Sequence, residues 1–457
     1  MDAFAIFLPL ALILVISKLL SIVCKKIGLP QVIGLLFTGV ILGLITLIPL
    51  SGGLEEYAFF SSDAMKGISI VAEIGVVLIM FSAGIETDLK QIKKTGVAAL
   101  VITLLGVIVP MIFGFLSALL LNIGKTPDFS VRAIFMYLFY GVILTATSVS
   151  VTIAALKELG KLNTPIGTAI VSSAILDDII GVIILSVILS LDKAVAGTGG
   201  ITEASDFISY LFKLMLGDSF GDVGWSIGIV VIKTVLFFLF ALGLGIPLRK
   251  LFKKISNKYD HHRRVPIFAI AVAFFYAYTS EKWFGIADIT GAFFAGLILS
   301  GTKDTEYIER RTDIASYMIF TPVFFAKVGI TSMSSFTSTS DFTWQFVVFG
   351  IVFIIAGILG KLLGCGFGAK LCKFSLKDSI RCGAGMMCRA EVCLICAQKG
   401  IDANIISASI QPFVLLLILI TSFITPIILK QSYKNEIASS YQELAFEENN
   451  QGPSLDQ

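Results

Sequence analysis

Long apolar stretches alternate with short polar connections along nearly the whole chain. Many of them reach the roughly 20 residues that an α-helix needs to cross the hydrocarbon core of a bilayer. The pattern predicts thirteen transmembrane spans, at residues 3–24, 31–50, 67–85, 96–122, 131–156, 164–191, 225–247, 265–284, 286–301, 312–331, 343–371, 378–397 and 404–430. We therefore expect an all-α polytopic membrane protein whose transmembrane domain occupies residues 1–430.

Two segments lack this pattern. Residues 192–224 contain Gly-Thr-Gly-Gly and an amphipathic piece around Ile208–Met215, which predicts an external loop with a short interfacial helix. Residues 431–457 are acidic and contain Gly-Pro-Ser near their end, which predicts a disordered cytoplasmic tail. We expect this tail to be too short for a nucleotide-binding regulatory domain.

The composition excludes a water-soluble protein. Hydrophobic residues make up 56% of the 457 residues and charged residues only 15%, and the mean hydropathy is +0.92. Because a soluble domain carries about 25% charged residues, lipid must cover most of this surface. We expect the bilayer to be the main partner and expect no nucleic-acid partner.

Basic residues are distributed unevenly between the two sides of the predicted spans. One side holds 22 of them: Lys25, Lys26, Lys90, Lys93, Lys94, Lys157, Lys161, the seven from Arg249 to Arg264, Lys303, Arg310, Arg311, Lys370, Lys373, Lys377, Lys430 and Lys434. The other side holds seven: Lys66, Lys125, Arg132, Lys193, Lys213, Lys282 and Lys399. Because cytoplasmic loops are enriched in Lys and Arg, we expect an external N-terminus, a cytoplasmic C-terminus and a location in the plasma membrane.

Charged residues inside the spans are the most informative, because each costs at least ~2.5 kcal/mol near the bilayer centre. They are Lys18, Glu73, Asp177, Asp178, Lys233, Asp288, Lys327, Lys361, Arg381, Arg389 and Glu391. Lys18 and Lys233 are long enough to reach the interface, and Asp288 begins its span, where a carboxylate caps free N–H groups. Arg381 and Lys327 lie near span ends. The others need a specific reason to be there.

Asp177 and Asp178 lie at the centre of the predicted span 164–191, about 20 Å from either end. Neighbouring helix positions differ by about 100° in direction, so one carboxylate can face a cavity while the other faces a neighbouring helix. Like charge and burial both disfavour ionisation, so the pair is expected to titrate as a coupled unit. Such a carboxylate holds either a proton or a hard monovalent cation. Lys361, which lies between Gly360 and Gly364 in mid-span, is a candidate partner for one of the two, although a fixed structural ion pair would explain the same residues.

Two spans carry stretches that weaken a helix. Leu144-Thr-Ala-Thr-Ser-Val-Ser150 is polar and β-branched, and Gly383-Ala-Gly-Met-Met-Cys-Arg-Ala-Glu391 combines glycines with two charges. Each is followed by one further long span. Interrupted helices at corresponding positions of two halves predict a site of unwound backbone at the membrane midplane. Glycine packing and hydroxyls bonded to their own helix would explain either stretch alone.

No cofactor is expected. Cys393 and Cys396 have the spacing of a redox or zinc pair, but inside an apolar helix this spacing more often means small packing residues. The histidines, His261 and His262, lie in the most basic loop, so they provide no intramembrane metal or catalytic centre.

Seven motifs together resemble the monovalent cation–proton antiporter superfamily, on its two-aspartate NapA- and Kef-like branch. In chain order they are Gly28-Leu-Pro-Gln-Val-Ile-Gly34, Ala72-Glu-Ile-Gly-Val-Val-Leu-Ile-Met-Phe-Ser-Ala-Gly-Ile-Glu86, Thr145-Ala-Thr-Ser148, Ala174-Ile-Leu-Asp-Asp178, Gly291-Ala-Phe-Phe-Ala-Gly296, Pro322-Val-Phe-Phe325 and Gly360-Lys361. The resemblance covers about residues 1–430. It departs from the family at Cys388-Arg389-Ala390-Glu391, where relatives carry Pro-Arg-Gly-Glu, and at Lys327, where relatives more often have a small residue.

The resemblance implies an inverted-repeat fold of about 13 helices with two crossed discontinuous helices. It implies a homodimer in which a mobile core domain moves past a dimerisation domain, elevator-fashion. Carried over residue by residue, Asp178 would bind Na⁺ or a proton, Asp177 would pair with Lys361, and Thr145 and Thr147 would offer oxygens to the ion. Glu73, Lys327, Arg389 and Glu391 would be supporting intramembrane charges. Electrogenic exchange of Na⁺ or Li⁺ for H⁺, with a role in pH homeostasis, is the expected activity.

Other functions fit the residues less well. The same fold could exchange K⁺ for H⁺, whereas a glutathione-gated efflux system would need the nucleotide-binding domain that the tail is too short to form. An intramembrane aspartyl protease takes its aspartates from separate helices, one of them in a Gly-x-Gly-Asp motif, so we expect no enzyme here. A channel does not need a carboxylate paired with a mid-membrane lysine, so this class of protein also fits less well.

Overall fold

The fold was analysed in a computed structural model of the chain. It describes residues 3–26, 31–46, 60–87, 89–120, 128–148, 164–196, 223–258, 264–302, 305–337 and 344–450, together with a few positions in 152–162 and 207–210. All regular structure in these residues is helical.

The helices follow the predicted apolar stretches closely. The first half of the chain forms η1 (Ala3–Ile6), α1 (Phe7–Lys26), α2 (Gln31–Thr46), α3 (Ser62–Glu86), α4 (Leu89–Leu119), α5 (Val131–Ile143) and α7 (Pro165–Ala196). The second half forms α9 (Val223–Lys258), α10 (Arg264–Phe284), α11 (Asp288–Leu299), α12 (Thr305–Ala315), η5 (Ser316–Phe320), α13 (Thr321–Thr337), α14 (Trp344–Leu371), α15 (Leu376–Gly385), α16 (Glu391–Asp402), η6 (Ala408–Ile410) and α17 (Gln411–Asn450).

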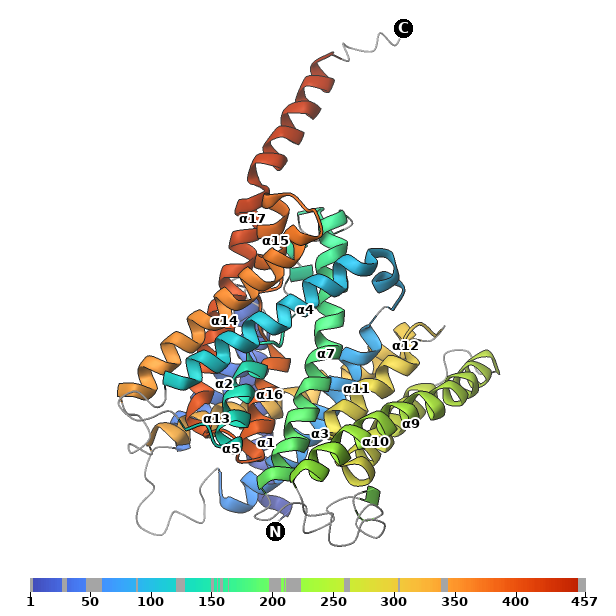
Figure 1. Cartoon of the computed structure of the whole chain (residues 1–457), viewed down its shortest axis with the longest axis vertical. Helices are drawn as coiled ribbons and strands as arrows, with labels where there is room; N and C mark the ends of the chain where they lie inside the picture. The colour runs from blue at the N-terminus through green and yellow to red at the C-terminus, as the bar shows by residue number, and fades with distance from the viewer. Residues whose placement is uncertain are drawn as a thin grey trace.

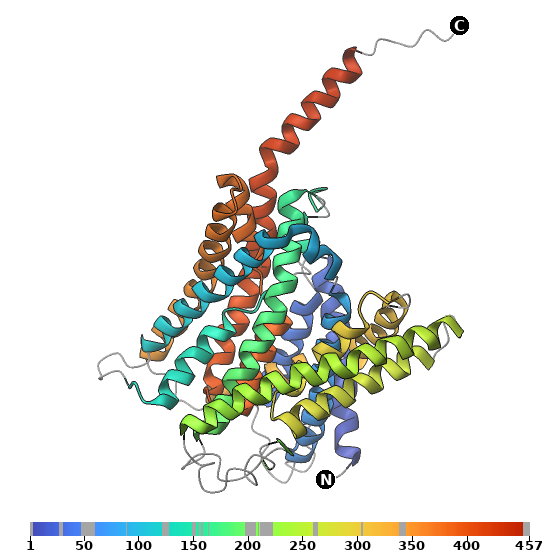
Figure 2. The ribbon, with the colours of Figure 1, turned by 45° about the vertical axis from the view of Figure 1, so that its right-hand side comes forward.

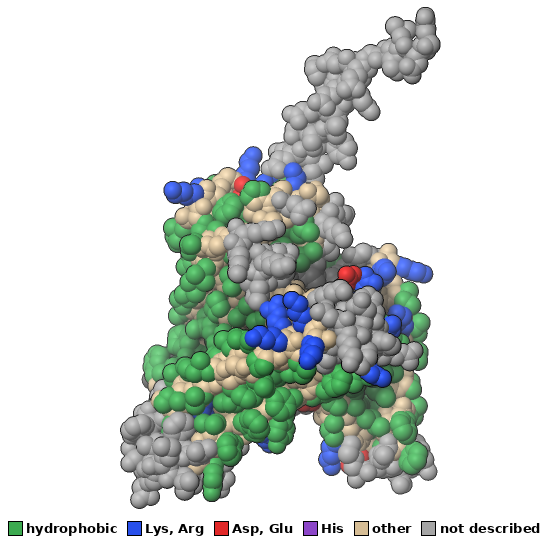
Figure 3. Space-filling view, turned by 90° about the vertical axis from the view of Figure 1, so that its right-hand side faces the viewer, with side chains coloured by type: hydrophobic (Ala, Val, Ile, Leu, Met, Phe, Trp, Pro, Cys, Tyr) green, Lys and Arg blue, Asp and Glu red, His purple; other side chains and the backbone are tan. Residues whose placement is uncertain are grey.

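Length and composition make eight helices of the described chain able to cross a membrane, and three shorter apolar helices, Gly34–Ile45, Val131–Ile143 and Asp288–Leu299, accompany them. The prediction of an all-α polytopic membrane protein is therefore confirmed. The count of thirteen spans stays a prediction. Figure 3 shows the expected surface, a broad hydrophobic face with basic side chains in separate groups.

Packing divides the helices into two bundles. We call α1, α2, α3, α10, α11, α12 and α13 the scaffold bundle, because they pack mainly on one another. We call α4, α5, α7, α14, α15, α16 and α17 the core bundle for the same reason. The long helix α9 packs on α7 of the core and on α10 and α11 of the scaffold, and it crosses obliquely in front of both (Figure 2).

The core bundle contains the same order of elements twice. A long helix, a helix with a break and a further long helix occur as α4, α5 and α7, and again as α14, α15–α16 and α17. After α5 the backbone leaves the helix at residues 144–148, and between α15 and α16 it does so at residues 386–390. Both predicted discontinuous helices are therefore confirmed, and the break at Cys388–Ala390 forms without the proline and glycine of relatives.

The two ends of the chain lie at opposite ends of the long axis (Figure 1). Helix α17 continues to Asn450, so the tail predicted to be disordered from residue 431 is helical as far as the structure describes it. Residues 431–450 contain no proline or glycine, so the helix meets no strong stop signal there. Of the predicted external loop at 192–224, residues 192–196 continue α7 and residues 223–224 begin α9. Most of the remainder, including most of the predicted interfacial helix, lies outside the described residues.

Candidate functional site

Asp177 lies at the middle of α7 and forms an ion pair with Lys361 of α14. The Lys361 Nζ donates to both carboxylate oxygens of Asp177, at 2.7 and 2.8 Å. The two side chains are 1% and 0% exposed, so neither charge is screened by solvent. The sequence predicted this pair across 184 residues of chain, and the geometry fits it.

Glycines on α14 allow Lys361 to reach α7. A Cβ atom at Gly360 would lie 2.8 Å from the Pro110 Cα, and one at Gly364 would lie 2.5 Å from the Leu105 carbonyl oxygen, both on α4. Helices α14 and α4 therefore meet backbone to backbone, which larger residues would prevent. This close contact carries the lysine into the centre of the core bundle.

Asp178 is left without a comparable partner. Its Oδ1 is buried and accepts no hydrogen bond from any described residue. Asp178 lies within electrostatic range of Asp177, Glu391, Lys361 and Glu86, of which only Lys361 is basic. A buried carboxylate oxygen with an unused lone pair beside a satisfied ion pair has the chemistry of a site for a proton or a hard cation.

The two breaks cross next to this aspartate pair. The Ser148 N–H donates to the Cys388 carbonyl at 2.8 Å, and the Thr147 hydroxyl donates to the Met386 carbonyl at 3.4 Å. The Thr145 hydroxyl donates to the Val142 carbonyl at 2.8 Å and leaves its oxygen lone pairs free to bind a cation. The predicted oxygen donors, Thr145 and Thr147, therefore lie at the crossing.

Arg389 holds the crossing together. Its guanidinium donates to the carbonyls of Leu144, at 2.5 Å, Gly357, at 3.2 Å, and Ala146. Leu144 is the C-cap of α5, where a helix presents free carbonyls and the negative end of its dipole. Arg389 is fully buried, and its charge replaces the helical hydrogen bonds that the break removes. Glu391 occupies the first turn of α16, where its negative charge faces the positive end of that helix dipole.

Glu73 and Lys327 lie elsewhere. Lys399 of α16 pairs with Glu73 of α3 and, at 2.8 Å, with Asp288 of α11. Lys399 is eight residues beyond Glu391 on the same helix, about 12 Å along its axis, so this cluster is separate from Asp178. Lys327 lines a small cavity beside Glu73 and Lys399. It is therefore not a second basic group at the aspartate pair.

A cavity of about 340 Å³ opens beside this ion cluster and is lined by Glu73, Glu281, Asp288, Lys399 and Asp402 among others. Sequence reasoning had assigned Asp288 to helix capping and Lys399 to a loop, and so it missed their pairing. An unexplained Glu73 in mid-span was the one signal that a basic partner was needed. Lys399 joins the core bundle to the scaffold bundle here, because α16 belongs to the first and α3 and α11 to the second.

These features define a polytopic membrane carrier with a buried aspartate pair at two crossed helix breaks. The chain belongs to the sodium/hydrogen exchanger family, because the family's transmembrane-domain model matches residues 11–433. It is 31% identical to the Na⁺/H⁺-K⁺ antiporter GerN of Bacillus cereus, over 94% of this chain and 97% of that one. It is 29% identical to a Na⁺/H⁺ antiporter of Enterococcus hirae, over 94% and 98% of the two chains. The sodium–proton antiporter MjNhaP1 of Methanocaldococcus jannaschii shares the fold, with a TM-score of 0.62 and 19% identity over 94% of this chain and 96% of that one.

Proposed function

We propose that this protein exchanges Na⁺ for H⁺ across the membrane, with Asp178 as the residue that binds either ion. The observation that carries this proposal is the Asp178 Oδ1, which is buried and unpartnered beside a neighbour that Lys361 already neutralises. The sequence similarity to antiporters over almost the full chain supports the exchange reaction.

Asp177 and Lys361 provide the coupling in this proposal. Na⁺ at Asp178 lies next to the ion pair, and its charge weakens the hold of Asp177 on the ammonium of Lys361. Lys361 then releases a proton, so that more than one H⁺ moves for each Na⁺ and the exchange is electrogenic. The oxygens of Thr145 and Thr147 replace part of the hydration shell of the ion.

Alternating access follows from the two bundles. The aspartates, Lys361 and both breaks belong to the core bundle, so the whole site can move as one body past the scaffold bundle. The Lys399 cluster joins the bundles and has to open during this motion. We further propose a plasma-membrane homodimer with an external N-terminus and a cytoplasmic C-terminus, in keeping with the bias of basic residues.

The test is dequenching of a pH-sensitive dye in everted vesicles after addition of Na⁺, Li⁺ or K⁺. Wild type should respond to Na⁺, Asp178→Asn should not, and Asp63→Asn, at the start of α3, should match wild type. Retained exchange in Asp178→Asn would overturn the assignment of the site. Normal electrogenic exchange in Lys361→Ala would overturn only the coupling role of the pair. A larger response to K⁺ than to Na⁺ would show that K⁺ is the preferred cation.

A further inference from the structure

The second helix break forms without the proline and glycine that relatives carry at positions 388 and 390. Proline ends a helix because it lacks an N–H and its ring fixes φ, and glycine weakens a helix. This chain has Cys388 and Ala390 instead, and alanine is the best helix former of all residues. Yet the backbone is not helical at residues 386–390. Contacts from elsewhere in the fold must therefore stabilise the break.

Two hydroxyl groups of α17 bind the backbone of Arg389. The Arg389 N–H donates to the Thr421 hydroxyl oxygen at 3.2 Å, and the Ser422 hydroxyl donates to the Arg389 carbonyl at 3.2 Å. The Thr421 hydroxyl donates in turn to the Leu417 carbonyl at 2.8 Å, which leaves its oxygen able to accept. All three residues of this contact are buried. The hydrogen bonds that Arg389 would make inside a helix are thus replaced by side chains of one neighbouring helix.

The other backbone groups of the break have different partners. Three carbonyls accept hydrogen bonds from the first break or from the residues just after it: Gly385 from the Thr152 hydroxyl at 2.6 Å, Met386 from the Thr147 hydroxyl at 3.4 Å, and Cys388 from the Ser148 N–H at 2.8 Å. These bonds connect the two breaks to each other. Thr421 and Ser422 connect the second break to α17, which is helical throughout this region.

This hydroxyl pair corresponds in position to the aspartate pair. Each pair consists of adjacent residues on the helix that closes its repeat, α7 or α17, roughly three turns after the start of that helix. The first repeat carries Asp177 and Asp178 at this position, and the second carries Thr421 and Ser422. The charged pair is the proposed ion site, whereas the uncharged pair binds Arg389, whose guanidinium reaches across to the first break.

We propose that Thr421 and Ser422 are positioning residues for ion exchange, which fix Arg389 so that its guanidinium holds the first break beside Asp178. The contacts run from the two hydroxyls to the Arg389 backbone, and from its guanidinium to the carbonyls of Leu144 and Ala146. Thr145, a proposed ligand of the ion, lies between these two carbonyls in the chain. Without the hydroxyls, the Arg389 backbone shifts and the ion site loses its shape. This inference rests on the proposed exchange at Asp178 and adds the groups that hold the site in place.

The test measures the Na⁺ concentration that gives half-maximal exchange, and the maximal rate, in everted vesicles. Thr421→Val/Ser422→Ala removes both hydroxyls and nearly keeps the side-chain shapes. It should raise the half-maximal concentration about 10-fold, because each lost polar contact typically costs a factor of roughly 2 to 10. A merely structural defect would leave less active protein and lower the maximal rate, but it would not change this concentration.

Two single variants are the controls. Thr421→Ser keeps the hydroxyl and should give a half-maximal concentration within about 2-fold of wild type. Thr425→Val, about one turn further along α17, removes a fully buried hydroxyl that makes no hydrogen bond to a described residue, and it should also match wild type.

Restoring the residues of relatives tests what the hydroxyls hold. Cys388→Pro/Ala390→Gly, added to Thr421→Val/Ser422→Ala, should return the half-maximal concentration to within about 3-fold of wild type, because proline ends the helix by itself. No hydrogen bond is lost by this change, since the Cys388 N–H donates to no residue that the structure describes.

Three results would overturn the inference: an unchanged half-maximal concentration in Thr421→Val/Ser422→Ala, an equal rise in Thr425→Val, or a rise that the restored proline and glycine do not reverse. If Asp178→Asn abolishes exchange while Thr421→Val/Ser422→Ala behaves as wild type, this inference fails and the proposed function stands. If Asp178→Asn retains exchange, the proposed function itself fails.

Discussion

The ion pair of Asp177 and Lys361 makes a quantitative prediction about stability. At an effective dielectric constant of about 20, two unit charges 2.7 Å apart attract each other by roughly 6 kcal/mol, which dehydration largely offsets. Removing one partner alone leaves a charge that is 0 or 1% exposed without the partner that it pairs with. Such a change typically costs about 3–5 kcal/mol.

A double-mutant cycle isolates this coupling. We expect Asp177→Asn and Lys361→Met each to lower the free energy of unfolding by about 3–5 kcal/mol. The double variant has lost both charges of the pair, so it should recover most of this loss and lie within about 1–2 kcal/mol of wild type.

The measurement is thermal unfolding of the purified protein in detergent, followed by the loss of monodisperse protein. The single variants should unfold at least about 5 °C below wild type, and the double variant close to it. If the two losses of unfolding free energy simply add in the double variant, the two side chains are not coupled. The ion pair would then not explain why a lysine occupies position 361 inside the membrane span. Transport should be impaired in all three variants, because each lacks at least one charge of the pair that couples to the ion. The double variant should regain stability without regaining this coupling.

Three further predictions follow from the same helices. Arg389→Lys should abolish exchange and destabilise the protein by about 2–3 kcal/mol, because one ammonium cannot serve three diverging carbonyls; wild-type dye dequenching would contradict this. Lys399→Met should lower the unfolding temperature by several degrees, because it leaves the partly buried Glu73 and Asp288 without their cation. A variant as stable as wild type in the same heating assay would show that the cluster is not a joint between the bundles. Gly364→Ala should slow exchange at least 10-fold, because the added methyl group separates α14 from α4 and withdraws the lysine; Gly243→Ala, where a Cβ meets nothing within 4 Å, is the control.

The hydrophobic pattern was enough to predict the class of the protein. Crossing a bilayer requires about 20 apolar residues in a helix, so the spans can be read from composition alone. The same physics made Asp177, Asp178 and Lys361 visible, because a charge in such a span is expensive. Local composition also revealed both helix breaks, since Thr145–Ser148 and the glycines before Arg389 weaken a helix wherever they occur.

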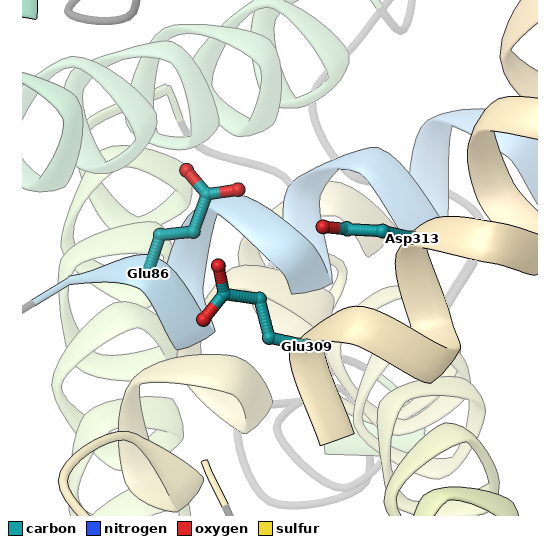
Figure 4. Close-up of side chains that lie close together, drawn as sticks. All are labelled: Glu86, Glu309 and Asp313. Atoms are coloured by element: carbon teal, nitrogen blue, oxygen red, sulfur yellow. The ribbon is translucent and has the colours of Figure 1, made fainter. Parts of the chain in front are cut away.

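Apart from the pair of Asp177 and Lys361, the pairing of distant charges was decided by the tertiary structure. Lys399 lies 326 residues from Glu73, and nothing local to either residue indicates that they meet. The same holds for Glu86, which ends one scaffold helix and joins Glu309 and Asp313 of another (Figure 4). Such contacts depend on which helix faces pack together, and no local periodicity specifies that choice. The sequence by itself determined a membrane carrier with an aspartate pair, and the fold decided which other charges accompany it.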